Sequence, residues 1–208
     1  MTRRRLPSAV KTQNRSNRWE DHYTRQARKE NFPARSVFKL NEIQNKFRLI
    51  KKGDFVLDLG CAPGSWLLKA AELAGENGRV VGIDLKPVTI RLPGNAVVFT
   101  GDILAPDDSL LTSLGKDFNV VLSDMAPATS GNKFTDAARS FDLCRAALSL
   151  ARTCLVPGGF FVCKIFQGED FKLFSEALKK HFARQSIFKP QSSRKASREI
   201  FLIGIGKR

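Results

Sequence analysis

Gly60 and Gly64 lie four residues apart in the segment 56–66, Val-Leu-Asp-Leu-Gly-Cys-Ala-Pro-Gly-Ser-Trp, directly after a short apolar run. Glycine lacks a Cβ atom, so the chain can turn sharply there and a ligand can approach the backbone closely. Asp58 precedes the loop, and Asp84 ends a second apolar run twenty residues after Gly64. An acidic residue at the end of the second strand of a βαβ unit commonly binds ribose hydroxyls. These residues predict a site for a cofactor that carries a nucleoside.

The spacing favours S-adenosylmethionine (SAM) over NAD as this cofactor. The dinucleotide fingerprint is G-x-G-x-x-G, and no G-x-x-x-x-G-K-[ST] phosphate loop occurs either. Asp58 would repel a pyrophosphate, but it would stabilise the ammonium of SAM, which carries no phosphate. The alternative is that the two glycines only allow a tight strand-to-helix turn. Against it, Asp84 and the pair Gly101-Asp102 stand where a cofactor needs them.

Apolar runs alternate with helical patterns along the chain, which predicts an α/β, Rossmann-like fold with helices on both faces of a mostly parallel seven-stranded sheet. The last two strands are joined by a loop without a helix, so the final strand is predicted to be antiparallel. The predicted strands are 55–59, 79–84, 96–99, 118–122, 160–165, 185–188 and 199–205, and the predicted helices are 34–51, 66–74, 136–155 and 169–182.

Polar residues gather at one edge of this predicted sheet, outside the carboxyl ends of the strands, where ligands of such folds bind. Asp84, Asp102 and Asp124 each follow a predicted strand, and Lys164 lies near the end of the fifth. A single Asp in such a place is often only a helix cap or a turn former. Several acids at the same edge are harder to explain by capping alone.

The chain is strongly basic, with 35 Lys and Arg against 20 Asp and Glu and a formal net charge of +15. This charge indicates a polyanionic partner, and nucleic acid is favoured over a membrane because no basic helix with a strong apolar face stands out. Residues 1–35 hold ten basic and three acidic residues. Three aromatic residues are interleaved with this charge: Trp19, Tyr23 and Phe32.

Basic and aromatic side chains together suit phosphate contact with base stacking, so we expect residues 1–33 to form a basic arm that contacts RNA. The first fifteen or so residues are too poor in apolar side chains to predict fixed structure, which makes this arm partly flexible. Residues 34–208 are expected to form the α/β domain that binds SAM. The alternative is a solvated, charged terminus whose aromatic residues attach it to that domain.

Cysteine and histidine usage points away from metal and disulfide chemistry. The chain has two His and four Cys without C-x-x-C spacing, so we expect no metal site, no disulfide framework and a reducing compartment. No apolar run of 18 residues and no secretory signal occur, so no membrane association is expected. We expect a cytoplasmic monomer. The mitochondrial matrix is the alternative location, because no acidic residue precedes Glu20.

Three segments together resemble the FtsJ-type (RrmJ-type) RNA ribose 2′-O-methyltransferases. They are Asp-Leu-Gly-Cys-Ala-Pro-Gly-Ser-Trp at 58–66, Ser-Asp-Met-Ala-Pro at 123–127 and Gly-Gly-Phe-Phe-Val-Cys-Lys-Ile-Phe at 158–166. The glycine loop alone indicates only a SAM enzyme, whereas the combination is specific. The resemblance covers roughly residues 18–208.

The resemblance implies a SAM-dependent methyltransferase fold and assigns roles to individual residues. The catalytic tetrad Lys-Asp-Lys-Glu of the family maps onto Lys39, Asp124, Lys164 and Glu199. The SAM contacts of the family map onto Gly64, Trp66, Asp84, Asp102 and Asp124, beside the Asp58 and Gly60 already singled out. Ser65 stands where the usual loop has a second glycine before Trp, a departure that would shift the loop without removing a contacting side chain.

The substrate implied by the resemblance is ribosomal RNA. Without an added RNA-binding domain, the chain is similar to the compact enzymes that methylate a uridine ribose in the peptidyl-transferase region of large-subunit ribosomal RNA. Members that act on tRNA anticodon loops share the same core and are the alternative. A ribosome-assembly factor on a methyltransferase scaffold is a second alternative, disfavoured by the intact tetrad. A small-molecule methyltransferase is a third, disfavoured by the charge of +15.

The expected reaction is an in-line displacement on the sulfonium methyl by a ribose 2′-oxygen, a poor nucleophile near neutral pH. Lys164 is the candidate for the group beside that oxygen. A neutral Lys164 would abstract the proton, and a charged one would stabilise the developing alkoxide. Lys39 and Glu199 would orient it. The sequence leaves both forms of Lys164 open, because Lys39 and the sulfonium would disfavour its charged form whereas Asp124 and Glu199 would favour it.

Overall fold

Seven strands form one sheet in the order β3-β2-β1-β4-β5-β7-β6, in a computed structural model that describes residues 15–128, 130–194 and 196–208, with side chains from residue 22 on. The strands are β1 (Phe55–Leu59), β2 (Arg79–Asp84), β3 (Ala96–Thr100), β4 (Phe118–Ser123), β5 (Leu155–Phe166), β6 (Phe182–Phe188) and β7 (Glu199–Lys207). The pairs among β3, β2, β1, β4 and β5 are parallel, whereas β7 is antiparallel to both β5 and β6. The predicted fold class and the antiparallel last strand are confirmed.

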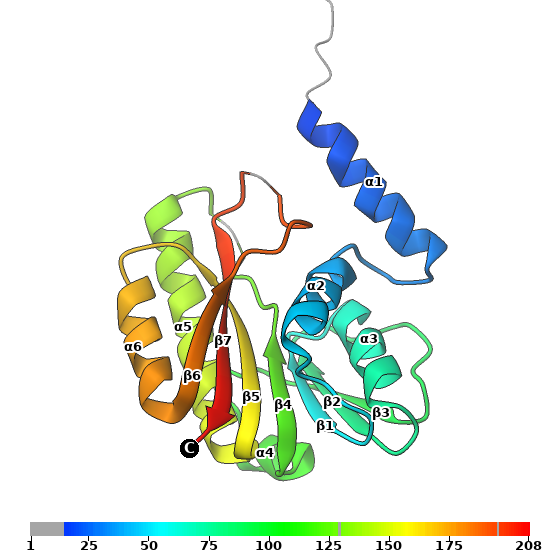
Figure 1. Ribbon diagram of the computed structural model, residues 1–208, viewed down its shortest axis with the longest axis vertical. Helices are drawn as coiled ribbons and strands as arrows, with labels where there is room; N and C mark the ends of the chain where they lie inside the picture. The colour runs from blue at the N-terminus through cyan, green and yellow to red at the C-terminus, as the bar shows by residue number, and fades with distance from the viewer. Residues whose placement is uncertain (1–14, 129, 195) are drawn as a thin grey trace, which may run out of the picture.

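Helices cover both faces of the sheet (Figure 1). They are α1 (Arg15–Lys29), α2 (Val37–Phe47), α3 (Ser65–Ala74), α4 (Asp108–Leu114), α5 (Lys133–Cys154) and α6 (Phe171–His181). α2 and α3 lie on one face and α5 and α6 on the other, while α1 projects away from the body of the molecule.

The core consists of two layers because neighbouring strand residues point to opposite faces of the sheet. Val56 packs with the apolar side of α2 and α3, and the adjacent Leu57 packs with α5 and α6. Both residues are fully buried, as expected for a central strand of a parallel sheet. All four cysteines are free and buried within these layers. This core holds the carboxyl ends of β1, β4 and β5 side by side.

The structure differs from the sequence prediction at several helix ends. α5 begins at Lys133 rather than at 136, because the Asn132 side chain accepts hydrogen bonds from the amides of Phe134 and Thr135. The same helix passes directly into β5 at Leu155, so this strand starts five residues ahead of the predicted strand 160–165. β6 likewise starts at Phe182, directly after α6.

Two helices were not predicted from the sequence. α1 occupies a segment of the basic arm, and α4 is a single short helix whose first turn is capped by the Asp107 carboxylate, which accepts from the Leu110 amide at 2.7 Å. α1 contains few apolar residues, and α4 is only seven residues long, so apolar periodicity did not reveal either helix. The expectation that the first fifteen or so residues lack fixed structure falls mostly on residues 1–14, which lie outside the described ranges, while Arg15 begins α1. The side chain of Trp19 also lies outside the described part of the chain. None of the described helices has the length and apolar character that crossing a bilayer requires.

Candidate active site

The loop after β1 is shaped by its two glycines. Gly60 and Gly64 have φ values of 77° and 113°, a region that disfavours residues with a Cβ atom. A Cβ atom on Gly60 would clash with the Met125 side chain, and one on Gly64 would clash with the Ile90 side chain. Both glycines are therefore needed for a close approach of segments, whether or not a ligand is bound. Gly64 also precedes the first turn of α3.

Asp58 is the most unusual charged residue beside this loop. Its side chain is 1% exposed, and its Oδ2 atom has no hydrogen-bond partner among the described residues. Burial raises the pKa of Asp58 to about 8, and the neighbouring charges of Asp124 and Asp84 act in the same direction. A buried carboxylate without a partner is costly, and a ligand cation beside it would remove that cost. The ammonium of SAM fits this requirement.

Asp84 and Asp102 stand at the ends of β2 and β3, as predicted. The two carboxylate oxygens of Asp84 accept from the amides of Ala62 (2.9 Å) and Lys86 (2.8 Å), so Asp84 links the glycine loop to the end of β2. Asp102 accepts from the Leu104 amide at 2.8 Å. Both residues thus form turns, and their oxygens keep further lone pairs for ribose or base atoms of a cofactor.

The indole of Trp66 is directed into the core. It is 3% exposed, its ring stacks on Phe201 with centroids 5.7 Å apart, and its Nε1 donates to the Ser36 carbonyl at 2.8 Å. This side chain holds the segment before α2 in place. The contact to SAM that the resemblance implies for Trp66 would therefore have to come from its backbone.

The four residues of the expected tetrad meet at the carboxyl edge of the sheet although they are far apart in the sequence. Lys39 comes from α2, Asp124 follows β4, Lys164 lies in β5 and Glu199 begins β7. The Lys39 Nζ atom is 2.9 Å from Glu199 Oε1 and 3.3 Å from Asp124 Oδ1. The Lys164 Nζ atom is 3.0 Å from the same Asp124 oxygen and also donates to the Asp124 backbone carbonyl. Asp124 therefore bridges the two lysines.

These charges are paired away from bulk water. Lys39 and Lys164 are only 9% and 6% exposed. Burial alone would lower the pKa of Lys39, but the charges and hydrogen bonds of Asp124 and Glu199 outweigh it and leave the pKa above its ordinary value. Burial likewise acts to raise the pKa of Glu199, and the charge of Lys39 outweighs it, so the pKa lies below its ordinary value. Both shifts favour a fixed ammonium–carboxylate pair.

Two further contacts that support this site were not foreseen from the sequence. Ser65 Oγ accepts from the Ala34 amide (2.7 Å) and donates to the Ala34 carbonyl (3.0 Å), so it joins the glycine loop to the segment before α2. Glu42 of α2 accepts from the amides of Gln191 (2.6 Å) and Ser192 (2.9 Å), which fixes the β6–β7 loop. The serine in place of glycine was a visible signal, but Glu42 offered none. Among the described residues, no group of three or more His, Cys, Asp or Glu side chains is arranged to hold a metal ion.

Comparison with known proteins agrees with this geometry. Residues 32–207 match the model of the FtsJ-like methyltransferase family. The chain is 59% identical over 198 residues to "Ribosomal RNA large subunit methyltransferase E" of Desulforapulum autotrophicum, covering 95% of this chain and 98% of that protein. A protein of the same name from Desulfatibacillum aliphaticivorans is 53% identical over 92% of this chain and 93% of its own length.

Solved structures give the same result at the level of the fold. The structure titled a putative ribosomal RNA methyltransferase from Plasmodium falciparum has a TM-score of 0.74 at 28% identity, covering 85% of this chain and 98% of that one. Aeropyrum pernix fibrillarin, solved with SAM bound, has a TM-score of 0.60 at 18% identity, covering 82% of this chain and 76% of that one, and supports the fold alone. The family match spans most of the chain and includes every residue of the tetrad. The chain belongs to the FtsJ-like methyltransferase family and is a SAM-dependent methyltransferase.

Proposed function

We propose that this protein methylates the 2′-hydroxyl of a ribose in ribosomal RNA of the large subunit, at a uridine of the peptidyl-transferase region. The observation that carries the proposal is the buried cluster of Lys39, Asp124, Lys164 and Glu199 beside a glycine loop suited to SAM. Relatives that share half or more of its residues over nearly the whole chain carry the name of a large-subunit ribosomal RNA methyltransferase, which supports the substrate class.

The residues for binding SAM lie around the glycine loop. Asp58 would pair with the ammonium, Gly60 and Gly64 would allow close approach of the backbone, and Asp84 would accept from ribose hydroxyls. Asp102 would face the adenine side, and Asp124 would lie between the methionine end and the two lysines. When bound, SAM supplies an electrophilic methyl group on a sulfonium that leaves as a neutral thioether.

The reaction releases one proton, because the 2′-hydroxyl loses its hydrogen when its oxygen bonds to the methyl group. The tetrad would control where this proton goes. Lys164, held by the carboxylate and the carbonyl of Asp124, is the group next to that oxygen. As a neutral amine it would accept the proton, and as an ammonium it would stabilise the developing alkoxide. Lys39, kept charged by two carboxylates, and Glu199 orient this pair. Much of the rate then comes from fixed placement of the reacting atoms.

The test is transfer of tritium from labelled SAM to RNA, with the wild-type protein and the Lys164→Ala variant. Large ribosomal subunits, small subunits, free ribosomal RNA and tRNA, all lacking 2′-O-methylation, are offered separately. We expect label on large-subunit RNA only, and a loss of at least about 10³-fold in Lys164→Ala with SAM affinity within about twofold of the wild type. Lys179→Ala, an exposed lysine on α6, serves as the matched control.

Other outcomes would redirect the proposal. Label on tRNA would keep the chemistry and move the substrate to the tRNA alternative. Tight SAM binding without label on any RNA would favour a scaffold role in ribosome assembly. Near wild-type turnover of Lys164→Ala would remove Lys164 from its central role.

We further propose that the protein acts as a monomer in the cytoplasm. The four free cysteines support a reducing compartment, and the two relatives described above come from bacteria. Light scattering of the purified protein, with and without RNA, tests the oligomeric state.

A further inference from the structure

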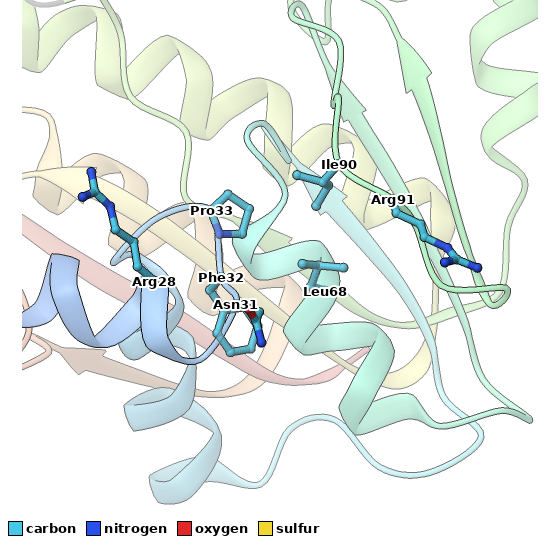
Figure 2. A pocket seen from close by; sticks show the side chains of 7 residues that line it. All are labelled: Arg28, Asn31, Phe32, Pro33, Leu68, Ile90 and Arg91. Atoms are coloured by element: carbon cyan, nitrogen blue, oxygen red, sulfur yellow. The ribbon is translucent and has the colours of Figure 1, made fainter.

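A hollow of about 410 Å³ lies between the segment before α2, the first turns of α3 and the β2–β3 loop. Figure 2 shows Phe32, Pro33, Leu68 and Ile90 around its apolar centre, with Arg28 and Arg91 on opposite sides. Asn31 completes the lining. We call this site the arginine-flanked hollow.

We propose that the arginine-flanked hollow binds one nucleotide of the RNA substrate, other than the nucleotide that is methylated. This inference rests on the proposed function and extends it to a second contact with RNA. In the arginine-flanked hollow, the base of this nucleotide packs against Phe32 and the apolar centre. The phosphates on either side of the nucleotide pair with Arg28 and Arg91.

The charge of the lining selects an anionic ligand. Arg28 and Arg91 are exposed, and no acidic side chain lines the hollow. Within the described part of the chain, neither guanidinium forms an ion pair. Guanidinium groups bind phosphates in a planar, two-pronged geometry. The chain as a whole carries a net charge of +15, which would draw a polyanion to this surface.

The centre of the hollow suits a base rather than a phosphate. Phe32 is half-buried and packs against a small cluster of Ala27, Val37 and Phe38, so its ring is held in place before any ligand arrives. Its amide donates to the Ala27 carbonyl at 2.8 Å, which fixes the backbone as well. An aromatic ring between cationic groups is the usual arrangement for stacking an unpaired base. The Asn31 side-chain amide can donate and accept at a base edge.

The position of the hollow links it to the reaction without placing it in the catalytic centre. Its lining shares no residue with the tetrad, so the nucleotide bound there is not the one that receives the methyl group. Ile90 would contact any side chain at Gly64, and Pro33 precedes the Ala34 that Ser65 holds. A nucleotide in the hollow would therefore fix the RNA relative to both the SAM loop and α2.

A second hollow of about 600 Å³ is less suited to the RNA backbone. It lies between the start of α5 and the β5–α6 loop, and its lining includes Lys133 and Arg198 but also Glu169 and Asp170. The two carboxylates would repel phosphates that the two cations attract. No carboxylate lines the arginine-flanked hollow, so nothing in its lining repels a phosphate.

The test compares binding of unmodified large-subunit ribosomal RNA by four proteins over a range of salt concentrations. They are the wild type, the double variant Arg28→Ala/Arg91→Ala, Phe32→Leu, and the control Arg79→Ala/Arg152→Ala. The control removes two exposed arginines from the opposite edge of the sheet, at the start of β2 and the end of α5. Thermal unfolding of each variant shows that it is folded, and leucine keeps the apolar contacts of residue 32.

We expect Arg28→Ala/Arg91→Ala to weaken RNA binding about tenfold and to reduce the slope of log K against log salt by about one to two units. Phe32→Leu should weaken binding about fivefold or more with the slope unchanged, because it removes stacking and no charge. Turnover at saturating RNA and affinity for SAM should stay within about twofold in both.

An equal loss in the control, or wild-type affinity in Phe32→Leu, would overturn the inference, since bulk charge would then explain the binding. Binding is measured without methyl transfer, so the proposed RNA site and the proposed methylation can be refuted independently of each other. RNA that binds through the hollow but accepts no methyl group would refute the proposed function alone. RNA that accepts a methyl group with unchanged affinity in the variants would refute the hollow alone.

Discussion

At the scale of single residues, the charges of the tetrad are paired with one another, whereas one oxygen of the buried Asp58 has no hydrogen-bond partner among the described residues. Lys39, Asp124, Lys164 and Glu199 neutralise one another within 3.3 Å contacts. Asp58, in β1 just before the glycine loop, is buried with an unpaired oxygen and a raised pKa. Such a residue destabilises the protein without ligand and becomes favourable when a cation binds.

Replacing Asp58 by Asn should change how stability depends on pH. The folded protein without SAM keeps the Asp58 proton up to a pKa of about 8, whereas the unfolded chain loses it near pH 4. The folded state therefore binds more protons in this window, and the stability of the wild type falls as pH rises from about 4 to 8. Asparagine does not titrate, so Asp58→Asn should lack this fall in the free energy of unfolding, which is on the order of a few kcal/mol in the wild type. Urea unfolding of both proteins from pH 5 to 8.5 measures the difference.

The same substitution should weaken SAM binding by about tenfold or more at pH 8, because the ammonium loses its carboxylate partner. Calorimetric titration of wild type and variant with SAM measures this. Parallel stability curves in the two proteins would show that the fold does not raise the pKa of Asp58, and unchanged SAM affinity would show that Asp58 is not the partner of the ammonium.

At the scale of elements, the catalytic side chains depend on loops that are tied to α2. Ser65 and Trp66 hold the segment before this helix through Ala34 and Ser36, and Glu42 holds the β6–β7 loop. α2 carries Lys39 between these two connections. The glycine loop, α2 and the last loop thus behave as one hydrogen-bonded unit.

Ser65→Ala should uncouple Lys39 from the cofactor loop while leaving the loop glycines intact. Two hydrogen bonds to Ala34 are lost, so unfolding should become easier by about 1–3 kcal/mol. We expect turnover to fall about three- to tenfold with SAM affinity nearly unchanged, because Lys39 and not the cofactor is displaced.

Ser113→Ala is the matched control, since the hydroxyl of Ser113 donates only to the Ser109 carbonyl within the exposed helix α4. It should leave both turnover and SAM affinity at wild-type values. A proportional loss of SAM affinity in Ser65→Ala would instead mean that Ser65 supports the cofactor loop itself.

At the scale of the whole molecule, the excess positive charge lies outside the tetrad, whose two lysines are balanced by two carboxylates. Four basic residues precede Arg15: Arg3, Arg4, Arg5 and Lys11. Charges of this kind contribute to RNA affinity by releasing counterions, without selecting a sequence.

Replacing these four residues by Gln should lower the slope of log K for RNA against log salt by up to about three to four units. Affinity at low salt should fall, and turnover at saturating RNA should stay near the wild-type value. Filter binding between about 50 and 200 mM salt measures both quantities. An unchanged slope would mean that the arm does not contact phosphates.

The sequence by itself determined the alternation of strands and helices, the antiparallel last strand and the edge of the sheet at which Asp84, Asp102 and Asp124 lie. These features depend on local apolar patterns and on glycine, whose effects act over a few residues. The same patterns missed α1, which has few apolar residues, and α4, which is only seven residues long. They also misplaced the start of α5, because the Asn132 cap sets it.

Only the tertiary structure decided which partners the functional side chains take. Lys39 and Glu199 are separated by most of the chain, and family resemblance alone linked them before their 2.9 Å contact was seen. Tertiary packing likewise turned Trp66 toward Phe201. The position of β1 between β2 and β4 left Asp58 buried, with no hydrogen-bond partner for its Oδ2 atom among the described residues. Burial and pairing arise from segments distant in sequence, so pKa shifts and hollows follow from the fold as a whole and not from any local pattern.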